Sequence, residues 1–263
     1  MMLQLRHRAI ARCVCLLTLC SVLAPPAPAA SGNAEPSGIA FYVLRVIYPE
    51  SERKGVTLTA YNKTATPYLM QSRIRPVDLV TGNVDMREQG DVATAMPFIV
   101  TPPLSRLEAH GELSLRIRRN DVPLPTDRES VFFISMKAIP SQPAPEQQVG
   151  DTQRMTLTVV SSLKVFYRPA GLNKRALVDT NVASQVRFRR EGNRLIANNP
   201  TPYWLTFSRL SVGTASLDKA QLRLMVPPKG QQQYTLPDGV GGEVNWTLID
   251  EDGWDTPVEK QSL

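Results

Sequence analysis

The chain has 263 residues, with 30 Lys and Arg, 24 Asp and Glu, two histidines, three cysteines and a formal net charge of +6. This length is sufficient for one large or two ordinary domains, each with its own hydrophobic core. One histidine and all three cysteines lie within the first 29 residues. If that segment is removed, the rest of the chain lacks the ligand sets of common zinc sites and any thiol nucleophile.

Residues 1–29 have the pattern of a secretory signal peptide. Arg6, Arg8 and Arg12 form a basic start, an apolar run follows at 14–24, and Ala27-Pro28-Ala29 is a small-x-small cleavage site. Cleavage leaves 27 of the 30 basic residues against 24 acids, a net charge of +3. This charge is too small for a nucleic-acid-binding protein, and no later apolar run is long enough to span a membrane. We therefore expect an exported protein that neither binds nucleic acid nor inserts into a membrane.

The first part of the mature chain is rich in strand patterns. Its runs of β-branched and aromatic residues are separated by turn residues and prolines. These runs cover residues 39–48, 55–62, 68–75, 112–118, 130–139 and 155–166. No segment shows a sustained helical period, so long helices are not expected.

A second series of shorter strand patterns follows. It covers residues 186–190, 194–198, 203–210, 221–226, 231–236 and 244–249. The break between the two series lies near residues 168–172. The sequence therefore predicts two β-sandwich domains, at residues 30–168 and 169–263, both of ordinary size.

The run at 155–166 follows a Pro- and Gln-rich segment and combines two features. Met155, Leu157 and Val159 alternate with threonines and share one face of a strand, and a single cation, Lys164, follows. The pattern suits an edge strand that adds a partner's strand and anchors one end of it. On periodicity alone, the more usual interpretation is that the apolar row faces the protein's own core.

Enzyme chemistry finds little support in the mature chain. A Ser-His-Asp site would have to use His110, which lies in a loop-like stretch before Gly111. A surface histidine in a turn is the favoured interpretation. We expect no enzyme, no cofactor and no metal site.

Several motifs, taken in order, resemble the PapD-like periplasmic chaperones of chaperone–usher pili. The resemblance covers nearly the whole mature chain. It rests on Leu44-Arg45-Val46-Ile47-Tyr48-Pro49, Thr66-Pro67-Tyr68-Leu69-Met70-Gln71, Pro97 to Pro103, Asp127-Arg128-Glu129-Ser130 with the following Val131-Phe132-Phe133, Lys164 to Pro169, and Asn199-Pro200-Thr201-Pro202-Tyr203. It implies an all-β fold of two immunoglobulin-like β-sandwich domains arranged in an L, of the short-loop class.

The family mechanism is donor-strand complementation. A pilus subunit that lacks its last strand has an apolar groove, and the resemblance implies that Met155, Leu157 and Val159 fill it. It also implies that Arg45 and Lys164 bind the subunit's C-terminal carboxylate. The alternatives are a structural ion pair for Arg45 and a solvated strand end for Lys164.

Two further sets of residues follow from the same resemblance. Glu129 and Arg168 match an interdomain ion network, whose third member is an acid of the pair Asp250-Glu251, with Glu251 preferred. A patch that meets the outer-membrane usher is matched by Leu69, Gln71, Thr101, Pro102, Pro103 and Ile139. Without the resemblance, these six are ordinary turn and edge residues.

The function expected from the sequence is that of a periplasmic, non-enzymatic chaperone. It would bind pilus or fimbrial subunits and deliver them to the outer-membrane usher. An exposed strand edge would also favour self-association of the unbound protein. The alternative is a secreted β-sandwich adhesin or a pilus structural subunit. Such a subunit would carry an N-terminal donor extension and lack its last strand.

Overall fold

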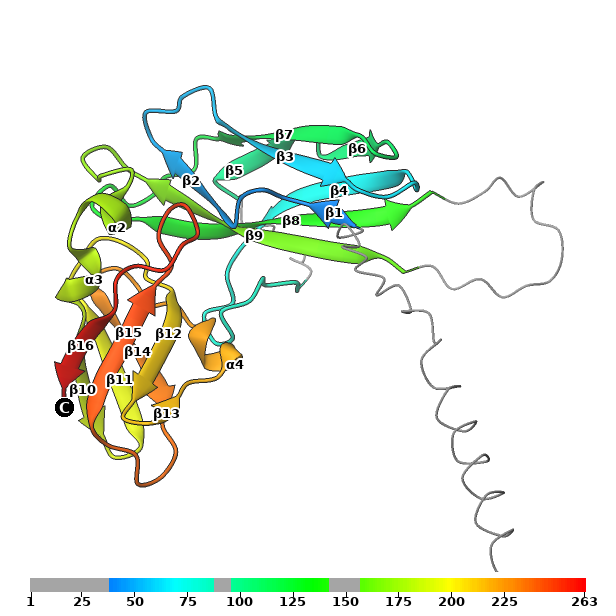
Figure 1. The fold of residues 1–263 in the computed structure, drawn as a ribbon. Coiled ribbons are helices and arrows are strands. Elements are labelled where there is room, and N and C mark those ends of the chain that lie inside the picture. Colours follow the sequence, from blue (N-terminus) through cyan, green and yellow to red (C-terminus); the bar gives the residue numbers. More distant parts are fainter. Residues whose placement is uncertain (1–37, 88–95, 142–156) are drawn as a thin grey trace, which may run out of the picture. The chain divides into compact units, whose positions relative to one another are not determined.

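The computed structural model describes residues 38–87, 96–141 and 157–263, and strands dominate it (Figure 1). The expected signal peptide and Met155 lie outside the described residues. Among the described residues, no helix is long and apolar enough to cross a membrane. The predicted all-β class is confirmed. The domain boundary at residue 168 and the L-shaped arrangement stay predictions.

The first half of the described chain contains two sheets. One has the order β1-β3-β7-β5, and the other has the order β2-β9-β8-β4-β6. The first consists of β1 (Ile39–Ala40), β3 (Val56–Asn62), β7 (Glu112–Arg119) and β5 (Phe98–Thr101). The second consists of β2 (Arg45–Pro49), β9 (Val159–Arg168), β8 (Ser130–Pro140), β4 (Tyr68–Arg75) and β6 (Leu104–Leu107). Side chains from both sheets form one core, which includes Tyr48, Leu115, Ile134 and Val165.

The prediction of a single strand over residues 39–48 is wrong. The run is divided into β1, which pairs antiparallel with β3, and β2, which pairs parallel with β9 in the other sheet. Residues 41–44 connect the two sheets. Composition alone does not show such a change of sheet, because both pieces keep strand-forming residues.

The second half also has two sheets. One contains β10 (Arg187–Glu191), β11 (Arg194–Asn199) and β14 (Gly230–Thr235). The other contains β13 (Ala215–Ser216), β12 (Phe207–Val212), β15 (Glu243–Leu248) and β16 (Glu259–Ser262). Its core includes Phe188, Phe207, Tyr234 and Trp246. Three four-residue helices complete the described part: α2 (Ala176–Asp179), α3 (Val182–Gln185) and α4 (Lys219–Leu222).

The strand predicted at residues 221–226 is also wrong at its start. The chain forms α4 there, and the Asp218 side chain accepts a hydrogen bond from the Gln221 N–H. An aspartate at this position satisfies a free N–H of the first turn and favours the helix. The strand predicted from residue 203 begins only at Phe207.

Candidate functional site

Arg45 and Lys164 are cross-strand neighbours. In the parallel pair of β2 and β9, Arg45 lies opposite Lys164. Val46 and Val165, the next residue on each strand, belong to the core. Since successive side chains of a strand point to opposite faces, both cations lie on the face of the sheet turned away from that core.

Residues of the second half cover the two cations. Arg45 is 9% exposed, and its Nη1 donates a 2.9 Å hydrogen bond to the backbone oxygen of Ile249. Its guanidinium carbon lies 5.2 Å from the centre of the Phe166 ring. The Lys164 Nζ lies 3.5 Å from Thr206 Oγ1. The sequence did not predict the contacts of Ile249 and Thr206 with these cations. A backbone carbonyl and a single threonine form no sequence motif that would indicate such a contact.

Neither cation has an anionic partner within 4.0 Å among the described residues. The Arg45 Nε is buried and has no hydrogen-bond partner there. A buried donor without a partner is costly, and an unpaired buried charge costs more. The site is therefore incomplete without an acceptor that carries negative charge.

The pKa values express the same cost. Burial, together with the neighbouring positive charge of Arg45, lowers the pKa of Lys164 to about 8. Burial also lowers the pKa of Arg45 to about 10, although Glu129, Glu251 and Asp250 oppose this change. Both side chains are charged at neutral pH, in surroundings that disfavour charge.

A second group of buried charges lies close by and is fully paired. Arg168 Nε lies 2.7 Å from Glu129 Oε1, and Arg168 Nη1 lies 2.8 Å from Glu251 Oε1. The guanidinium also donates to the backbone oxygens of Asn173 and Lys174. Of the two acids left open by the sequence, Glu251 makes the ion pair. We call Glu129, Arg168 and Glu251 the ion network.

Backbone N–H groups satisfy the carboxylates of the ion network. Glu129 Oε2 accepts from the Trp204 N–H at 2.7 Å. The Glu251 carboxylate accepts from the N–H groups of Leu177 and Val178 at 3.1 and 3.2 Å. Burial raises the pKa of Glu129, while the Arg168 charge and the Trp204 N–H oppose the rise. The Glu129–Trp204 bond joins the start of β8 to the second half, and the Arg168–Glu251 ion pair does the same for the end of β9.

The start of β9 has a free edge. On one side β9 pairs with β8 as far as Val159, opposite Ala138. On the other side β2 pairs only with the stretch from Lys164 to Arg168. Residues 159–163 therefore have no neighbouring strand on that side among the described strands. An edge of this kind is a template for a further strand.

Apolar side chains mark this free edge. Val159 lies on the same face as Leu163 and Val165, and it is 56% exposed. Leu157, two residues earlier, is 69% exposed. The apolar row predicted from the sequence is thus exposed at the two described positions, and the interpretation that these residues fill the protein's own core is not supported.

The residues of the expected usher patch come from neighbouring elements. Leu69 and Ile139 are opposite each other in β4 and β8, and Gln71 follows two positions along β4. Thr101, Pro102 and Pro103 lie at the passage from β5 to β6. The Pro103 backbone oxygen accepts from the Ser72 N–H at 2.8 Å, which holds this passage against β4. The patch as a binding surface stays a prediction.

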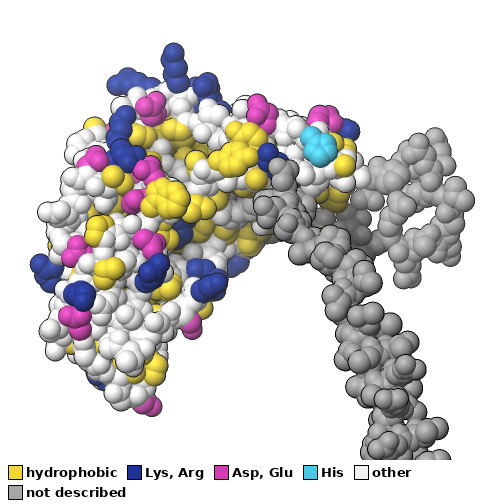
Figure 2. Space-filling view, in the orientation of Figure 1, with side chains coloured by type: hydrophobic (Ala, Val, Ile, Leu, Met, Phe, Trp, Pro, Cys, Tyr) yellow, Lys and Arg dark blue, Asp and Glu magenta, His cyan; other side chains and the backbone are white. Residues whose placement is uncertain are grey.

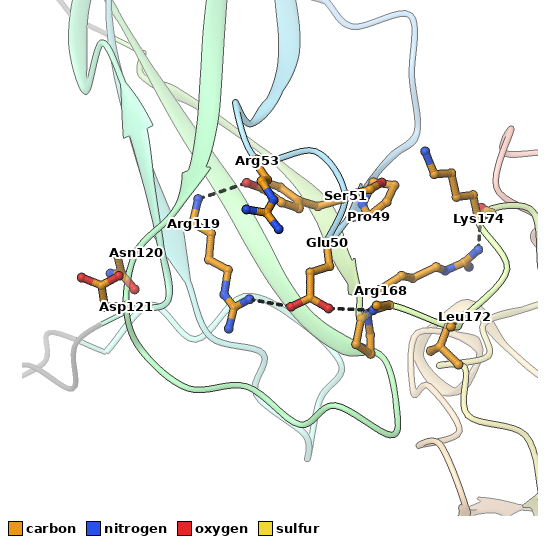
Figure 3. A pocket seen from close by; sticks show the side chains of 14 residues that line it. Pro49, Glu50, Ser51, Arg53, Arg119, Asn120, Asp121, Arg168, Leu172 and Lys174 are labelled. Carbon is orange, nitrogen blue, oxygen red and sulfur yellow. Dashed lines mark hydrogen bonds and ion pairs between the residues drawn. The ribbon is translucent and has the colours of Figure 1, made fainter.

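A cavity of about 980 Å³ lies beside the same junction (Figure 3). Its charged residues partner one another: Arg119 Nη1 lies 3.3 Å from Glu50 Oε1, and Glu50 Oε2 accepts from the Ala170 N–H at 2.7 Å. The Ala170 N–H lowers the pKa of Glu50. Arg119 also stacks on Tyr167, with 4.9 Å between the guanidinium carbon and the ring centre. These contacts tie the turn after β2 to the segment after β9.

Comparison with known proteins identifies the family. Residues 38–173 match the model of the pili and flagellar-assembly chaperone, PapD N-terminal domain, and residues 181–260 match that of the pili assembly chaperone PapD, C-terminal domain. The chain belongs to the PapD family of pilus-assembly chaperones. The predicted chaperone function is thereby confirmed over the adhesin alternative. The PapD family is a chaperone family rather than an enzyme class, and its members are periplasmic.

Individual relatives agree with this assignment. The chaperone protein FimC of Escherichia coli K12 is 36% identical over 228 residues, which cover 86% of this chain and 85% of FimC. The chaperone protein FimB/FhaD of Bordetella pertussis is 32% identical over 244 residues, covering 91% of this chain and 92% of that protein.

Solved structures of PapD-family chaperones have the same fold. A structure of the Salmonella enterica SafA pilin in complex with the SafB chaperone matches with a TM-score of 0.70 and 28% identity, over 87% of this chain and 98% of that one. The E. coli chaperone DraB matches with a TM-score of 0.68 and 31% identity, over 86% and 99% of the two chains.

Proposed function

We propose that this PapD-family chaperone binds a pilus subunit by lending it the first part of β9, and that Arg45 and Lys164 bind the subunit's C-terminal carboxylate. One observation carries the proposal: two neighbouring cations, Arg45 buried and Lys164 half-buried, have no anionic partner in the described chain and lie at the end of a free strand edge. The two features explain each other, because a strand added to that edge would end beside the cations.

The register favours a strand terminus over an internal acidic residue. A partner strand can follow residues 159–163 only as far as Lys164, because β2 occupies the edge from there on. The partner strand therefore has to stop or turn away at this point. If it runs parallel to β9, in line with β2, its last residue lies next to Arg45.

The two neighbouring positive charges favour a carboxylate. Arg45 and Lys164 lie opposite each other, have no ion-pair partner among the described residues, and repel each other. A carboxylate bound between them would offset this repulsion. Its two oxygens could accept from the unpaired Arg45 Nε and from the Lys164 ammonium, and such charge-assisted bonds are strong in buried surroundings.

The apolar row would supply the hydrophobic part of the contact. Leu157 and Val159, and Met155 before them, would enter the groove left by the missing strand of the subunit. Main-chain hydrogen bonds along the edge would give affinity, and the apolar side chains would give register. The strand that fills the groove belongs to the chaperone and not to the subunit. A neighbouring subunit can displace it if its own strand has the more favourable binding free energy, and this exchange needs no ATP.

Delivery to the usher completes the proposal. The patch of Leu69, Gln71, Thr101, Pro102, Pro103 and Ile139 is the surface we assign to the outer-membrane usher. Its residues lie on β4, at the end of β8 and in the passage from β5 to β6, whereas the cation site lies on β2 and β9. Export would use the signal peptide of residues 1–29, and N-terminal sequencing of the exported protein should find Ala30 first.

Co-expression with a pilus subunit tests the carboxylate site. Arg45→Ala and Lys164→Ala should each abolish co-purification of the subunit and leave it to degradation. The control is Arg189→Ala, which removes an exposed arginine on β10 that pairs with Glu191. If both site variants protect the subunit as well as the control does, the anchoring role is excluded.

A further inference from the structure

Two exposed apolar side chains, from distant parts of the sequence, flank the cation site. Leu44, the residue before Arg45, is 65% exposed, and Trp254, in the loop between β15 and β16, is 73% exposed. A Cβ placed on Gly253 would lie 2.9 Å from Leu44 Cδ1, so Leu44 packs directly on this loop. Figure 2 shows hydrophobic side chains at the surface in this region. We call Leu44 and Trp254 the apolar ledge.

The loop that carries Trp254 is a closed, well-bonded turn. The Asp250 carboxylate accepts from the N–H groups of Asp252 and Trp254, each at 2.9 Å. The Trp254 backbone oxygen accepts from the Asp250 N–H at 2.8 Å. Ion pairs of Asp252 with Arg175 and of Asp255 with Arg209 fix both ends of the turn. The indole is therefore presented on a fixed support.

Gly253 makes the contact with Leu44 possible. Its φ of 90° lies in the region that favours glycine, and any side chain there would collide with Leu44. The turn thus brings the backbone against Leu44 while Trp254 remains exposed.

The apolar ledge is continuous with the cation site. Ile249, whose backbone oxygen accepts from Arg45, pairs with Asp255, the neighbour of Trp254. Leu44 is the neighbour of Arg45 in the chain. Both segments that carry the ledge thus also contribute to the cation site, Leu44 through Arg45 and Trp254 through Ile249.

We propose that the apolar ledge is a subsite for a bulky apolar side chain at the C-terminus of the pilus subunit. This inference rests on the proposed carboxylate site, since the ledge borders only that end of the partner strand. Rigid aromatic side chains contribute strongly to binding when a partner covers them. The cations would recognise the terminal carboxylate, and the ledge would select which residue carries it.

Peptide binding to the mature protein tests the inference. The probes are fluorescein-labelled synthetic peptides of alternating apolar sequence, identical except for the last residue, Phe or Ser, and each made with a free or an amidated C-terminus. Fluorescence anisotropy gives the Kd. The free Phe peptide should bind about tenfold more tightly than the free Ser peptide, the gain expected from burying an aromatic side chain in part.

Trp254→Ser and Leu44→Thr should bring the Phe-to-Ser ratio close to one, while amidation still weakens binding. Val80→Ser is the matched control, because Val80 is an exposed apolar residue in a different loop. It should leave the ratio unchanged. Both ledge side chains are largely exposed, so their variants should fold, and circular dichroism checks this.

The outcomes separate the two proposals. If amidation has no effect on any protein, the carboxylate site itself is wrong. If amidation weakens binding but the ratio is the same in Trp254→Ser as in the wild type, only the ledge is wrong. Sedimentation velocity adds a further outcome: dimerisation of the wild type that Trp254→Ser abolishes, with an unchanged ratio, would make the ledge a self-association surface and overturn the inference.

Discussion

Two groups of buried charge lie within a few residues of each other, and they differ in how completely they are paired. Arg168, at the end of β9, has two carboxylates, two backbone oxygens and the ring of Tyr203 around it. Arg45 has one backbone oxygen, the ring of Phe166 and an unpaired Nε, and Lys164 has one long contact to a hydroxyl. Both groups are shielded from water by the same two halves of the chain.

This difference separates a structural role from a binding role. A buried charge that is fully bonded holds the parts it joins in one geometry. A buried charge that is not bonded destabilises the free protein, and it is tolerated where a ligand completes it. The ion network therefore fixes the junction that keeps Arg45 and Lys164 buried, and the two cations remain available to an anion from outside.

The largest effect should come from breaking the ion network. Glu129→Ala removes one carboxylate and leaves the Arg168 guanidinium buried with a single acid. We expect the free energy of unfolding in urea to fall by about 3–5 kcal/mol. Glu191→Ala removes an exposed acid that pairs with Arg189, and it should lower that free energy by less than about 1 kcal/mol.

A triple replacement sharpens this prediction. Glu129→Leu, Arg168→Met and Glu251→Gln together remove all three buried charges of the network. The triple variant should be destabilised less than Glu129→Ala, because it leaves no buried charge without its full set of partners. Equal unfolding free energies for wild type and Glu129→Ala would show that the network contributes nothing to the junction.

Removing the charge of Lys164, which has no anionic partner among the described residues, should raise the free energy of unfolding. Lys164→Met keeps the length and apolar stem of the side chain and removes a charge that burial disfavours. We expect it to raise the free energy of unfolding at pH 7 by about 1–2 kcal/mol. The same variant should lose the subunit. A destabilised Lys164→Met protein would mean that the ammonium makes a stabilising contact in the free protein.

The cation site and the ion network also show which features could be predicted from the sequence. Alternation along β9 correctly separates Lys164 from Val165. The exposure of residues 157 and 159 came from the resemblance to the PapD family, because their alternation alone favours a place in the protein's own core. The pairing of Arg45 with Lys164 came from the resemblance to the PapD family, because a parallel register between distant segments has no local signal. Glu251 was preferred over Asp250 before the turn was known, and the turn supplies the physical reason, since the Asp250 carboxylate accepts hydrogen bonds within the turn itself.

Where the sequence misled, tertiary structure or a local side-chain bond decided. Residues 39–48 look like one strand, yet the chain changes sheet between Ala40 and Arg45. Residues 221–226 look extended, yet Asp218 caps a short helix that includes the first two of them. The β16 strand was not predicted because its sequence, Glu-Lys-Gln-Ser, has no apolar alternation. The contacts of Thr206 and Ile249 with the cations depend on how the two halves pack.

The binding role also predicts a pH dependence. The pKa of Lys164 in the free protein is about 8, below its ordinary value of 10.5. The unfolded chain therefore holds more protons between these values, and the stability of the free protein should rise with pH across this window. Subunit binding should change in the opposite sense, because the carboxylate needs the charged ammonium.

Affinity for a pilus subunit should fall by about tenfold from about pH 7 to about pH 9, as expected for the loss of one proton from a group with this pKa. Surface plasmon resonance at several pH values measures it. Lys164→Arg is the control, since a guanidinium keeps its charge over this range. A pH profile shared by the wild type and Lys164→Arg would exclude Lys164 as the titrating group.

The smallest expected effect is on subunit affinity, and it distinguishes the two faces of β9 at its free edge. Val159 and Val160 are adjacent and both exposed, at 56% and 45%, but they point to opposite faces of β9. Val159→Thr keeps the shape and strand preference of the side chain and adds a hydroxyl to the apolar row. It should weaken subunit binding about fivefold, since a hydroxyl in an apolar groove costs about 1 kcal/mol.

Val160→Thr makes the same chemical change on the other face and should leave the affinity within about twofold, as surface substitutions usually do. Both variants should unfold at the same urea concentration as the wild type, because neither side chain belongs to the core. If Val160→Thr weakens binding as much as Val159→Thr, both faces contact the subunit. The edge would then act through its backbone alone, and the apolar row would have no special part in filling the groove.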